Sequence, residues 1–528
     1  MTCLLLLLST SLLAPHLQVA EAEPGRFEVE VPPTILARLE GLETLEDSRL
    51  IIDLLPAHGG YGGGAEEAAI LRASTPVAAW ELGSEEVTLD RLLGLLELGA
   101  PARSFPGDWD ELEGEFIAIP TLVMVDDRDV DPIVVRGEGS RVRLGKGRDG
   151  PVSLGLDDVL VETTSDPRPD PGVLEVELGS ELLSDRVLPG GRRGEVTHRA
   201  YVVLPDGYHD LSAKRRLWPV VYVITGAEEA RKRAASIADL VELPTTRGVL
   251  PQVIWVVLEK DTEHGHHFFV DSDLHGPRGS ALVEEFIPWL DVRFRTIPDA
   301  GARLLVGEQQ GGHGVLNLLI EHPEVFSNAW AVSPDAASFG ALGTIDLYRD
   351  RDAFRREGGT SRPALRSALG SERELVHLDV EGEVMRARVL YGEGIPRSRW
   401  HELSATFGGL PGLDRRAWWP FDPSEGGIRP AQVERWARQD LARRVAEDPR
   451  QAALLRQRAR IMVGDRDERY RDRGILVLAD SVDRSTGTED RDWIKIVEGA
   501  GSLETGVIAR MYVGEEVIRV LRDRGHHE

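Results

Sequence analysis

A sharp turn between a strand and a helix, centred on position 309, constrains the fold of this chain more than any other feature. Residues 303–306 have the apolar pattern of a buried strand, and residues 313–322 have the pattern of a helix. Between them, Gly307 and Gly311 stand two positions on either side of Gln309. Such a turn requires small residues at these two positions, because its backbone passes close to the sheet and to the helix.

Strands and helices alternate on both sides of this turn. The segments 200–205, 218–224 and 253–258 are β-branched or wholly apolar runs, and helical patterns follow them, notably over 281–294. This alternation predicts an α/β fold, a mostly parallel sheet with helices on both faces. In such a sheet, a glycine-flanked turn after a strand is a nucleophile elbow. We therefore expect an α/β-hydrolase domain over 173–525.

The chain before this domain has a different pattern. Short strand-like runs punctuated by Gly, Pro and Asp predict a mainly β N-terminal domain over 23–162, in the form of a sandwich. The runs are 27–31, 116–119, 121–125 and 132–135. Leucines at helical spacing predict one helix there, over 89–98. Residues 163–172 contain alternate prolines and no apolar residue, which predicts a linker.

A long insertion, about 351–458, interrupts the predicted hydrolase domain. Its pattern is largely helical, and insertions at this point of such folds form a lid over the mouth of the active site. It contains four tryptophans, Trp400, Trp418, Trp419 and Trp436. They could stack on a ligand, but we favour the simpler interpretation that they anchor the lid to the main domain.

The first 22 residues have the pattern of an export signal. An almost unbroken apolar run over 4–13 is followed by Ala20-Glu21-Ala22, a small-x-small cleavage pattern. The run is shorter than the roughly 20 residues that span a bilayer. The positively charged leader of a standard signal is missing, and the alternative is a buried helix. We expect a secreted or periplasmic protein. The only cysteine, Cys3, precedes the run, so the mature chain would have no disulfide and no thiolate site.

The composition limits the partners of the chain. A hydrophobic content of 41% and a charged content of 29% are those of a soluble globular protein. The formal net charge of -27 argues against nucleic acid and anionic membranes, because phosphate binding requires clustered positive charge. We expect no membrane span, and a partner that is a small molecule or a protein of unknown identity.

Several motifs around the turn resemble one family of α/β-hydrolases, the esterases that include enterochelin esterases, esterase D and the mycolyltransferases. The resemblance covers about 173–522, is strongest over 258–348, and is closest to enterochelin-esterase-like secreted proteins with an added N-terminal domain. In that family the elbow reads G-x-S-x-G-G, and only the serine differs here, as Gln309. The other matching motifs are Phe269-Val270-Asp271-Ser272, Gly276-Pro277, residues 282–288, Phe294-Arg295-Thr296, residues 322–326 and Ala331-Val332-Ser333-Pro334-Asp335.

The resemblance also implies where the other two members of a catalytic triad should be. The family's acid lies in a G-x-x-D context after a late strand, which Asp467 matches here. The family's histidine follows the last strand, but residues 498–502 contain none. The nearest later histidines, His526 and His527, lie beyond a predicted terminal helix over 505–524. No intact triad is therefore expected.

The absence of two triad members predicts that the chain has no serine-esterase activity. A triad serine attacks once a histidine removes its proton, whereas the lone pair of a glutamine amide nitrogen is delocalised. We therefore interpret the chain as a catalytically inactive esterase-like protein, a pseudoenzyme with a ligand- or partner-binding pocket around Gln309. The elbow and oxyanion framework could persist, because it depends on backbone N–H groups. Its expected residues are Gly307, Gln310, Gly311 and Gly226, with Thr225-Gly226 standing where the family has H-G.

Two alternatives stay open. The chain could be an active carboxylic-ester hydrolase with non-standard groups, such as water activated by Asp467 or His313, or a scaffold whose working part is the N-terminal domain. No cofactor and no metal are expected. One loop has the composition of a metal site, but adjacent histidines cannot easily share one face of an extended segment, so we favour a packed or pocket-lining loop. Its polar residues are His264, His266, His267, Asp271, Asp273 and His275.

Overall fold

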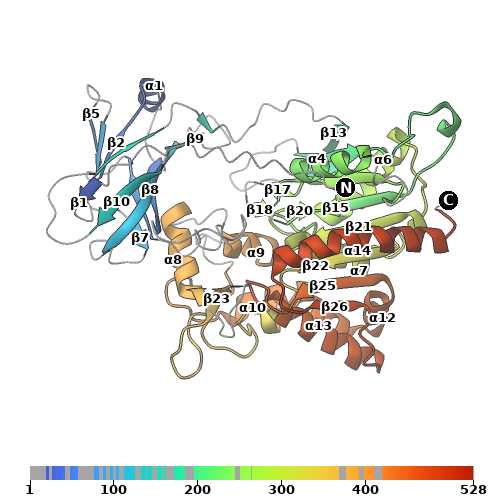
Figure 1. Ribbon diagram of the computed structural model, residues 1–528. Helices are drawn as coiled ribbons and strands as arrows, with labels where there is room; N and C mark the ends of the chain where they lie inside the picture. The colour runs from blue at the N-terminus through green and yellow to red at the C-terminus, as the bar shows by residue number, and fades with distance from the viewer. Residues whose placement is uncertain are drawn as a thin grey trace, which may run out of the picture. The chain divides into compact units, whose positions relative to one another are not determined.

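The chain folds into two compact units in the computed structural model (Figure 1). The first is Met1–Ser165 together with Arg388–Leu390, and the second is Asp166–Ala387 together with Tyr391–Glu528. The structure describes residues 20–22, 27–41, 48–56, 76–82, 87–90, 95–98, 101, 103–105, 112–124, 133–137, 139–144, 152–156, 160–161, 172–184, 196–226, 228–243, 250–262, 264–367, 376–391, 398–409 and 419–526.

The N-terminal unit is a sandwich of two sheets, which confirms the mainly β prediction. One sheet has the order β1-β10-β8-β3-β4-β7 with β9 and β12 beside β8, and the other has the order β11-β2-β6-β5. Both sheets contribute to one apolar core, which includes Phe27, Leu50 and Trp80. The elements are β1 Ala20–Ala22, β2 Phe27–Glu30, α1 Pro33–Gly41, β3 Arg49–Pro56, β4 Val77–Glu81, β5 Val87–Asp90, β6 Leu95–Leu98, β7 Arg103–Phe105, β8 Gly114–Met124, β9 Ile133–Arg136, β10 Ser140–Leu144, β11 Val152–Gly155 and β12 Leu160–Val161.

The helix predicted over 89–98 is wrong. The described part of this segment lies in β5 and β6, which pair with each other, and β6 also pairs with β2. Leu96 and Leu98 are buried in the core of the sandwich, with Glu97 between them. Alternation of buried and polar residues is the period of a strand, and here it prevails over the leucine spacing that suggested a helix.

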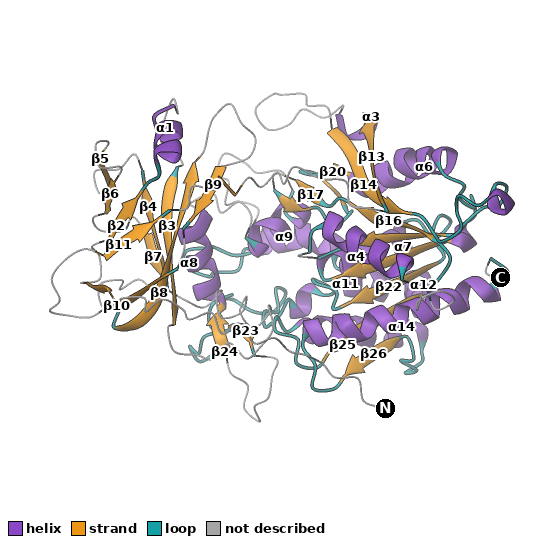
Figure 2. Cartoon of the chain, turned by 45° about the horizontal axis from the view of Figure 1, so that its top comes forward, coloured by secondary structure: helices purple, strands orange, loops and turns teal. Residues whose placement is uncertain are grey.

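The second unit contains one eight-stranded sheet of the predicted α/β type (Figure 2). Its order is β13-β14-β16-β15-β21-β22-β25-β26. The strands from β16 to β26 are parallel, while β13 and β14 are antiparallel additions at one edge. The bounds are β13 Val173–Ser180, β14 Val196–Val203, β15 Val220–Ile224, β16 Ile254–Leu258, β21 Arg303–Glu308, β22 Asn328–Val332, β25 Ala459–Gly464 and β26 Ile494–Val497.

Helices cover both faces of this sheet, because successive side chains of a strand point to opposite faces. Leu305 belongs to a core that includes residues of α6, α7, α11, α12 and α13, whereas its neighbour Leu304 packs with α4 and α14. The bounds are α4 Ala230–Glu242, α6 Ile287–Arg293, α7 Gln310–Glu321, α11 Leu441–Glu447, α12 Pro449–Arg458, α13 Arg471–Thr486 and α14 Ser502–Asp523. The helix predicted over 281–294 is built from the end of α5 (Arg278–Ala281), a π-helical turn (Leu282–Phe286) and α6.

The insertion lies between β22 and β25, and its apolar core also includes Phe268 and Val270 from the loop after β16. That core includes three of the four tryptophans, Trp400, Trp419 and Trp436, each at most 3% exposed, so they anchor the insertion. Trp418 lies outside the described residues. Besides α11 and α12, the insertion contains β23 Pro363–Arg366, β24 Val376–Asp379, α8 Val380–Tyr391, α9 Arg399–Phe407 and α10 Pro430–Trp436.

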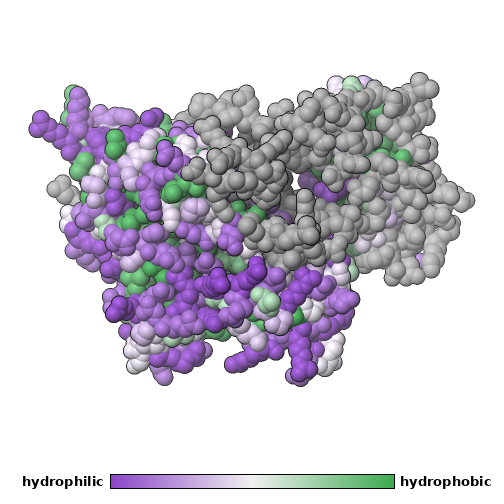
Figure 3. Space-filling view, turned by 180° about the vertical axis from the view of Figure 1, so that it is seen from behind, coloured by the Kyte–Doolittle hydropathy of each residue, from purple (hydrophilic) through white to green (hydrophobic). Residues whose placement is uncertain are grey.

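Two sequence predictions fall almost wholly outside the described residues. These are the export signal, of which only β1 is described, and the linker, of which only Gly172 is described. None of the described helices combines the length and the apolar character that crossing a membrane requires. The described surface in Figure 3 is largely hydrophilic, with hydrophobic residues in small scattered patches.

Candidate functional site

The turn at position 309 has the backbone of a nucleophile elbow. β21 ends at Glu308 and α7 begins at Gln310, so Gln309 alone forms the tip, with φ 52° and ψ -114°. The tip is fixed to the neighbouring strand, because Gln309 N–H donates to the carbonyl of Val332 at 2.8 Å and its own carbonyl accepts from Asp335 N–H at 2.9 Å.

Both flanking glycines are required by close backbone contacts. A Cβ atom on Gly307 would lie 2.2 Å from the carbonyl oxygen of Gly311. A Cβ atom on Gly311 would lie 2.1 Å from the carbonyl oxygen of Ile224. Since the obstructing atoms belong to the backbone, no side-chain movement would relieve either contact.

The side chain of Gln309 lies against Gly226, at the carboxyl end of β15. A Cβ atom on Gly226 would stand 2.5 Å from Gln309 Oε1, so the amide packs directly on the glycine backbone. Gln310 is the first residue of α7, and the first N–H groups of a helix have no partner within the helix. The expected oxyanion framework and the side chain of Gln309 therefore lie side by side.

Asp467 is wholly buried just after β25, but its partners are not those of a triad acid. Its carboxylate accepts from the N–H groups of Arg469 and Arg471 and is 3.1 Å from the guanidinium Nη1 of Arg471. No histidine contacts Asp467 among the residues that the structure describes. His526 lies elsewhere, near Asp299, at 4.0 Å, and His527 is outside the described residues.

A buried network of ion pairs connects this acid with the elbow. Arg399, from α9 of the insertion, contacts Asp335 at 2.9 Å, and Arg471 lies between Asp335 and Asp467, with its Nε 4.0 Å from Asp335. Burial alone would raise the pKa of Asp335, but the charges of Arg399 and Arg471 lower it below its usual range. The network therefore joins Asp335, which bonds to Gln309, to the acid position at Asp467.

Sequence reasoning did not assign a role to Asp335, Arg399 or Arg471. The sequence did contain one hint of the pair between Arg471 and Asp467. Arg471 stands four residues after Asp467 and is the first residue of a helix. Asp335 follows the carboxyl end of β22, where the functional groups of parallel sheets gather. Arg399 is 64 residues from Asp335, and no local pattern could have paired them.

Glu402, a residue of α9, is a second carboxylate close to the elbow. It accepts a long hydrogen bond from the side-chain amide of Gln310, at 3.4 Å, and lies against Gly265. Burial and the nearby charge of Asp261 raise the pKa of Glu402 to about 7. Glu402 is therefore the group near the elbow that changes its charge at neutral pH.

Replacing Glu402 with glutamine is expected to stabilise the protein more at pH 8 than at pH 4.5. A native pKa of about 7 against an ordinary value of 4.5 means that the native state binds this proton more tightly than the unfolded state. The carboxylate therefore destabilises the fold as pH rises through this window, by about 3 kcal/mol in total. Urea unfolding across this pH range measures the difference. The exposed Glu434→Gln is the control, and parallel curves for the two variants would contradict the prediction.

The histidine-rich loop is packed into the protein, as favoured above. His266 Nε2 donates to the carbonyl of Thr225 at 2.9 Å, and its Nδ1 accepts from Phe268 N–H. Burial, with the charge of Lys260, lowers the pKa of His266 to about 3, so its ring is neutral. Among the described residues, no group of three or more side chains is placed to bind a metal ion.

His313, considered above as an alternative base, is buried in α7. Its Nδ1 lies 3.2 Å from the carbonyl oxygen of Ala336, and its ring packs against Phe268 and Phe407. Burial lowers the pKa of His313 to about 4. The ring is therefore neutral and enclosed by apolar side chains.

This mostly parallel sheet, with a strained elbow between β21 and α7, defines an α/β-hydrolase. The model of the family described as "Putative esterase" matches residues 195–500, more than half of the chain. The chain therefore belongs to this esterase family. No curated protein matches the chain significantly.

Solved structures similar to the chain include esterases and an S-formylglutathione hydrolase. A ferulic acid esterase is 16% identical, over 66% of this chain and 98% of that one, with a TM-score of 0.39. The enterobactin esterase FES from Shigella flexneri is 14% identical, over 67% of this chain and 60% of that one, with a TM-score of 0.35. An S-formylglutathione hydrolase from Agrobacterium tumefaciens is 13% identical, over 66% and 96%, with a TM-score of 0.33.

Proposed function

We propose that this chain is a non-hydrolytic member of the esterase family that binds a small molecule or a protein partner. The observation that carries the proposal is the position of Gln309. An amide side chain stands where the family has its serine and packs on Gly226. It offers no nucleophilic oxygen that a base could activate, because its nitrogen lone pair is delocalised and its carbonyl oxygen has no proton to lose.

The surroundings of Gln309 support the same proposal. In a working triad the acid orients a histidine, which accepts the proton of the nucleophile. Asp467 is instead neutralised by Arg471, and the loop after β26 contains no histidine. The remaining backbone of the elbow can still present N–H groups to a ligand or to a partner.

Hydrolysis of p-nitrophenyl acetate and butyrate by the purified full-length protein tests the proposal. We expect kcat/KM about 10⁶-fold below that of a serine-bearing family member assayed in parallel, because loss of a triad serine or histidine has an effect of about this size. Turnover within tenfold of that enzyme, abolished by a change of one residue near the elbow, would contradict it.

The second candidate is an active hydrolase that uses a different base. Glu402 supports this alternative better than Asp467 or His313, because its pKa is about 7 and it contacts Gln310. Ester hydrolysis that rises with pH around 7 in the wild type and is lost in Glu402→Gln would favour this alternative over the first proposal.

We also propose that the protein is exported, on the basis of the apolar segment over 4–13 and the small-x-small motif at 20–22. Cleavage after Ala22 would remove Cys3, the only thiol of the chain. Determination of the N-terminal residue of the protein recovered outside the cytoplasm tests this. An uncleaved chain that stays in the cytoplasm would contradict it.

A further inference from the structure

The side chain of Glu402 is packed against the elbow and bonded to an amide. Its carboxyl group lies on the backbone of Gly265, where an added Cβ atom would stand 2.5 Å from Cγ of Glu402, and it accepts from Nε2 of Gln310 at 3.4 Å. Among the residues that the structure describes, no lysine or arginine is paired with it. Since Gln310 is the first residue of α7, the side chain of Glu402 covers the part of the elbow where this helix begins.

The other end of the Gln310 amide shows which form of Glu402 fits here. Oε1 of Gln310 is buried and accepts no hydrogen bond from the described residues. A neutral carboxyl group can donate to this oxygen and accept from Nε2, whereas a carboxylate can only accept. A carboxylate would therefore leave the buried oxygen without a donor, which costs free energy. The pair of side chains favours the protonated form of Glu402.

The charges around Glu402 favour the same form. Burial raises its pKa most, and among the charges that act on it Asp261 comes first, followed by Lys260 and Asp335. Each of these three charges already has an ion-pair partner. Asp261 is 2.6 Å from the ammonium of Lys260, and Asp335 is 2.9 Å from Arg399. An ionised Glu402 would thus add a carboxylate that has no counter-charge of its own.

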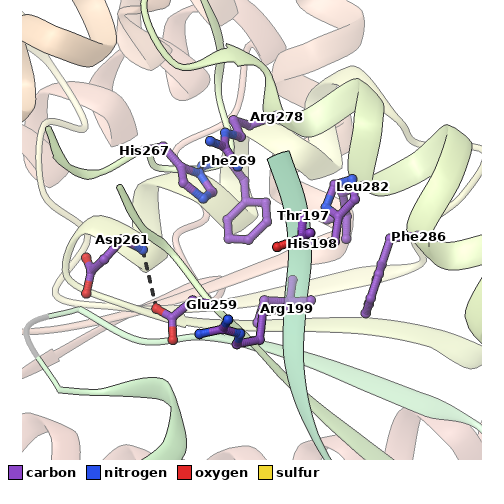
Figure 4. Close-up of a pocket in the computed structure, with 11 residues that line it drawn as sticks. Thr197, His198, Arg199, Glu259, Asp261, His267, Phe269, Arg278, Leu282 and Phe286 are labelled. Atoms are coloured by element: carbon purple, nitrogen blue, oxygen red, sulfur yellow. Dashed lines mark hydrogen bonds between the residues drawn. The ribbon is translucent and has the colours of Figure 1, made fainter. Parts of the chain in front are cut away.

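The negative charge of Asp261 is held in place beside Glu402. Asp261 lines a neighbouring cavity of about 200 Å³, and its main-chain N–H donates to the carboxylate of Glu259 at 3.4 Å, the bond drawn in Figure 4. Its side chain is 54% exposed, whereas that of Lys260 is 4% exposed. The backbone bond and the ion pair together fix the position from which Asp261 acts on Glu402.

Most of the neighbouring histidines do not supply positive charge near neutral pH. Burial lowers the pKa of His266 to about 3 and that of His401 to about 4, and it lowers the pKa of His275 well below its ordinary value. His264 lies against His401, with 5.6 Å between the ring centroids. His264 is therefore the ring whose titration has to be separated from that of Glu402.

We propose that Glu402 is a pH-dependent cover over the elbow. In the neutral form, its carboxyl group lies between Gly265 and Gln310, and its hydroxyl donates to Oε1 of Gln310. When the proton passes to water, that bond is lost and the carboxylate faces the charge of Asp261. Because Glu402 is partly exposed, its side chain can then turn outward into solvent. The beginning of α7 and the backbone at Gly265 are uncovered.

A cover of this kind regulates access to the elbow, so its importance rests on the proposed function, in which a ligand or a partner binds there. The cover itself is measured without ligand or substrate. A negative result would therefore overturn the cover and leave the test of ester hydrolysis unaffected. Ester turnover close to that of a serine-bearing enzyme would contradict the proposed function and leave the cover standing.

Hydrogen exchange of the full-length protein, followed by mass spectrometry, tests the proposal. Segments 264–267 and 309–313 report on the covered backbone. Each wild-type rate is divided by that of Glu402→Gln at the same pH, which removes the intrinsic effect of pH, because glutamine stays neutral and can donate to Gln310 at every pH. We expect a ratio near one at pH 5.5 and of at least about 10 at pH 8.5, since each pH unit above the pKa lowers the neutral population tenfold.

Low concentrations of urea separate a local cover from a general loss of stability. A local opening exposes little surface, so its exchange rate should be nearly the same with and without about 1 M urea, whereas exchange through unfolding rises steeply. Acceleration of 264–267 and 309–313 that grows with urea as unfolding does would overturn the proposal. A ratio near one at pH 8.5 would overturn it as well.

Three further variants assign the proton to Glu402. Asp261→Asn removes the like charge and leaves Lys260 without its partner, so the pH at which exchange accelerates should fall by about 0.5 or more. His264→Gln should leave that pH unchanged, as should Glu434→Gln, which alters a carboxylate that is 73% exposed. Loss of the transition in His264→Gln, or an unchanged midpoint in Asp261→Asn, would overturn the proposal.

Discussion

Replacing Gln309 with serine is expected to leave ester hydrolysis at the background level, about 10⁶-fold below that of a serine-bearing family member. The new hydroxyl would stand at the tip of an intact elbow, but no imidazole would be present to remove its proton. The acid position would not help, because Asp467 is paired with Arg471 and is not free to orient a base. Initial rates with p-nitrophenyl butyrate, measured for wild type and variant at equal concentration, give the result.

Gln309→Ala is the matched control for this experiment. Both variants remove the amide that packs on Gly226, and only the serine variant adds a hydroxyl. We expect equal rates for the two variants, within the error of the assay. If the serine variant were 100-fold or more faster than the alanine variant, a base would be present near position 309, and our interpretation of the triad would be wrong.

Replacing Asp335 with alanine is expected to lower the free energy of unfolding by about 3–5 kcal/mol. Asp335 is 2% exposed and its partner Arg399 is 12% exposed, so the variant would leave a guanidinium inside the protein without its counter-charge. The same carboxylate also accepts from Ala336 N–H, and that bond would be lost too. Urea unfolding followed by tryptophan fluorescence measures the change.

An exposed ion pair provides the control for this effect. Asp490 is 61% exposed and pairs with Arg456 at 3.1 Å, so Asp490→Asn is expected to change the free energy of unfolding by less than about 1 kcal/mol. The double variant Asp335→Leu with Arg399→Met removes both buried charges together. It should be destabilised less than Asp335→Ala alone, because no unpaired charge remains. Equal effects of Asp335→Ala and Asp490→Asn would contradict the prediction.

The α/β sheet could be predicted from the sequence because its central strands, such as β15, β16 and β22, are fully buried. The runs 218–224 and 253–258 are apolar on both faces, which matches β15 and β16 between two layers of helices. The sandwich was harder, because most of its strands are short and some of them alternate between buried and exposed residues, as β11 does. The segment 89–98 shows the difficulty, since a leucine-rich run of this length fits a helix as well as two short strands.

Some residues of the candidate site could be identified from the sequence around them, and others could not. Gln309 and Asp467 could be proposed from the sequence, because each stands a few residues after a predicted strand that ends in a glycine. Arg399 could not, since its place beside Asp335 depends on how α9 of the insertion packs on the sheet domain. The pKa of Glu402 likewise depends on burial by segments far away in the sequence, which no local pattern reports.

The backbone at the tip of the elbow has a consequence for the energy of the native state. A residue other than glycine at φ 52° and ψ -114° lies in a sparsely populated conformation, which costs about 1–3 kcal/mol. The cost arises from the Cβ atom and is the same whether the side chain is a serine or a glutamine. The native state therefore contains backbone strain at the tip of the elbow. The hydrogen bonds from Gln309 to Val332 and Asp335 hold the backbone in this conformation.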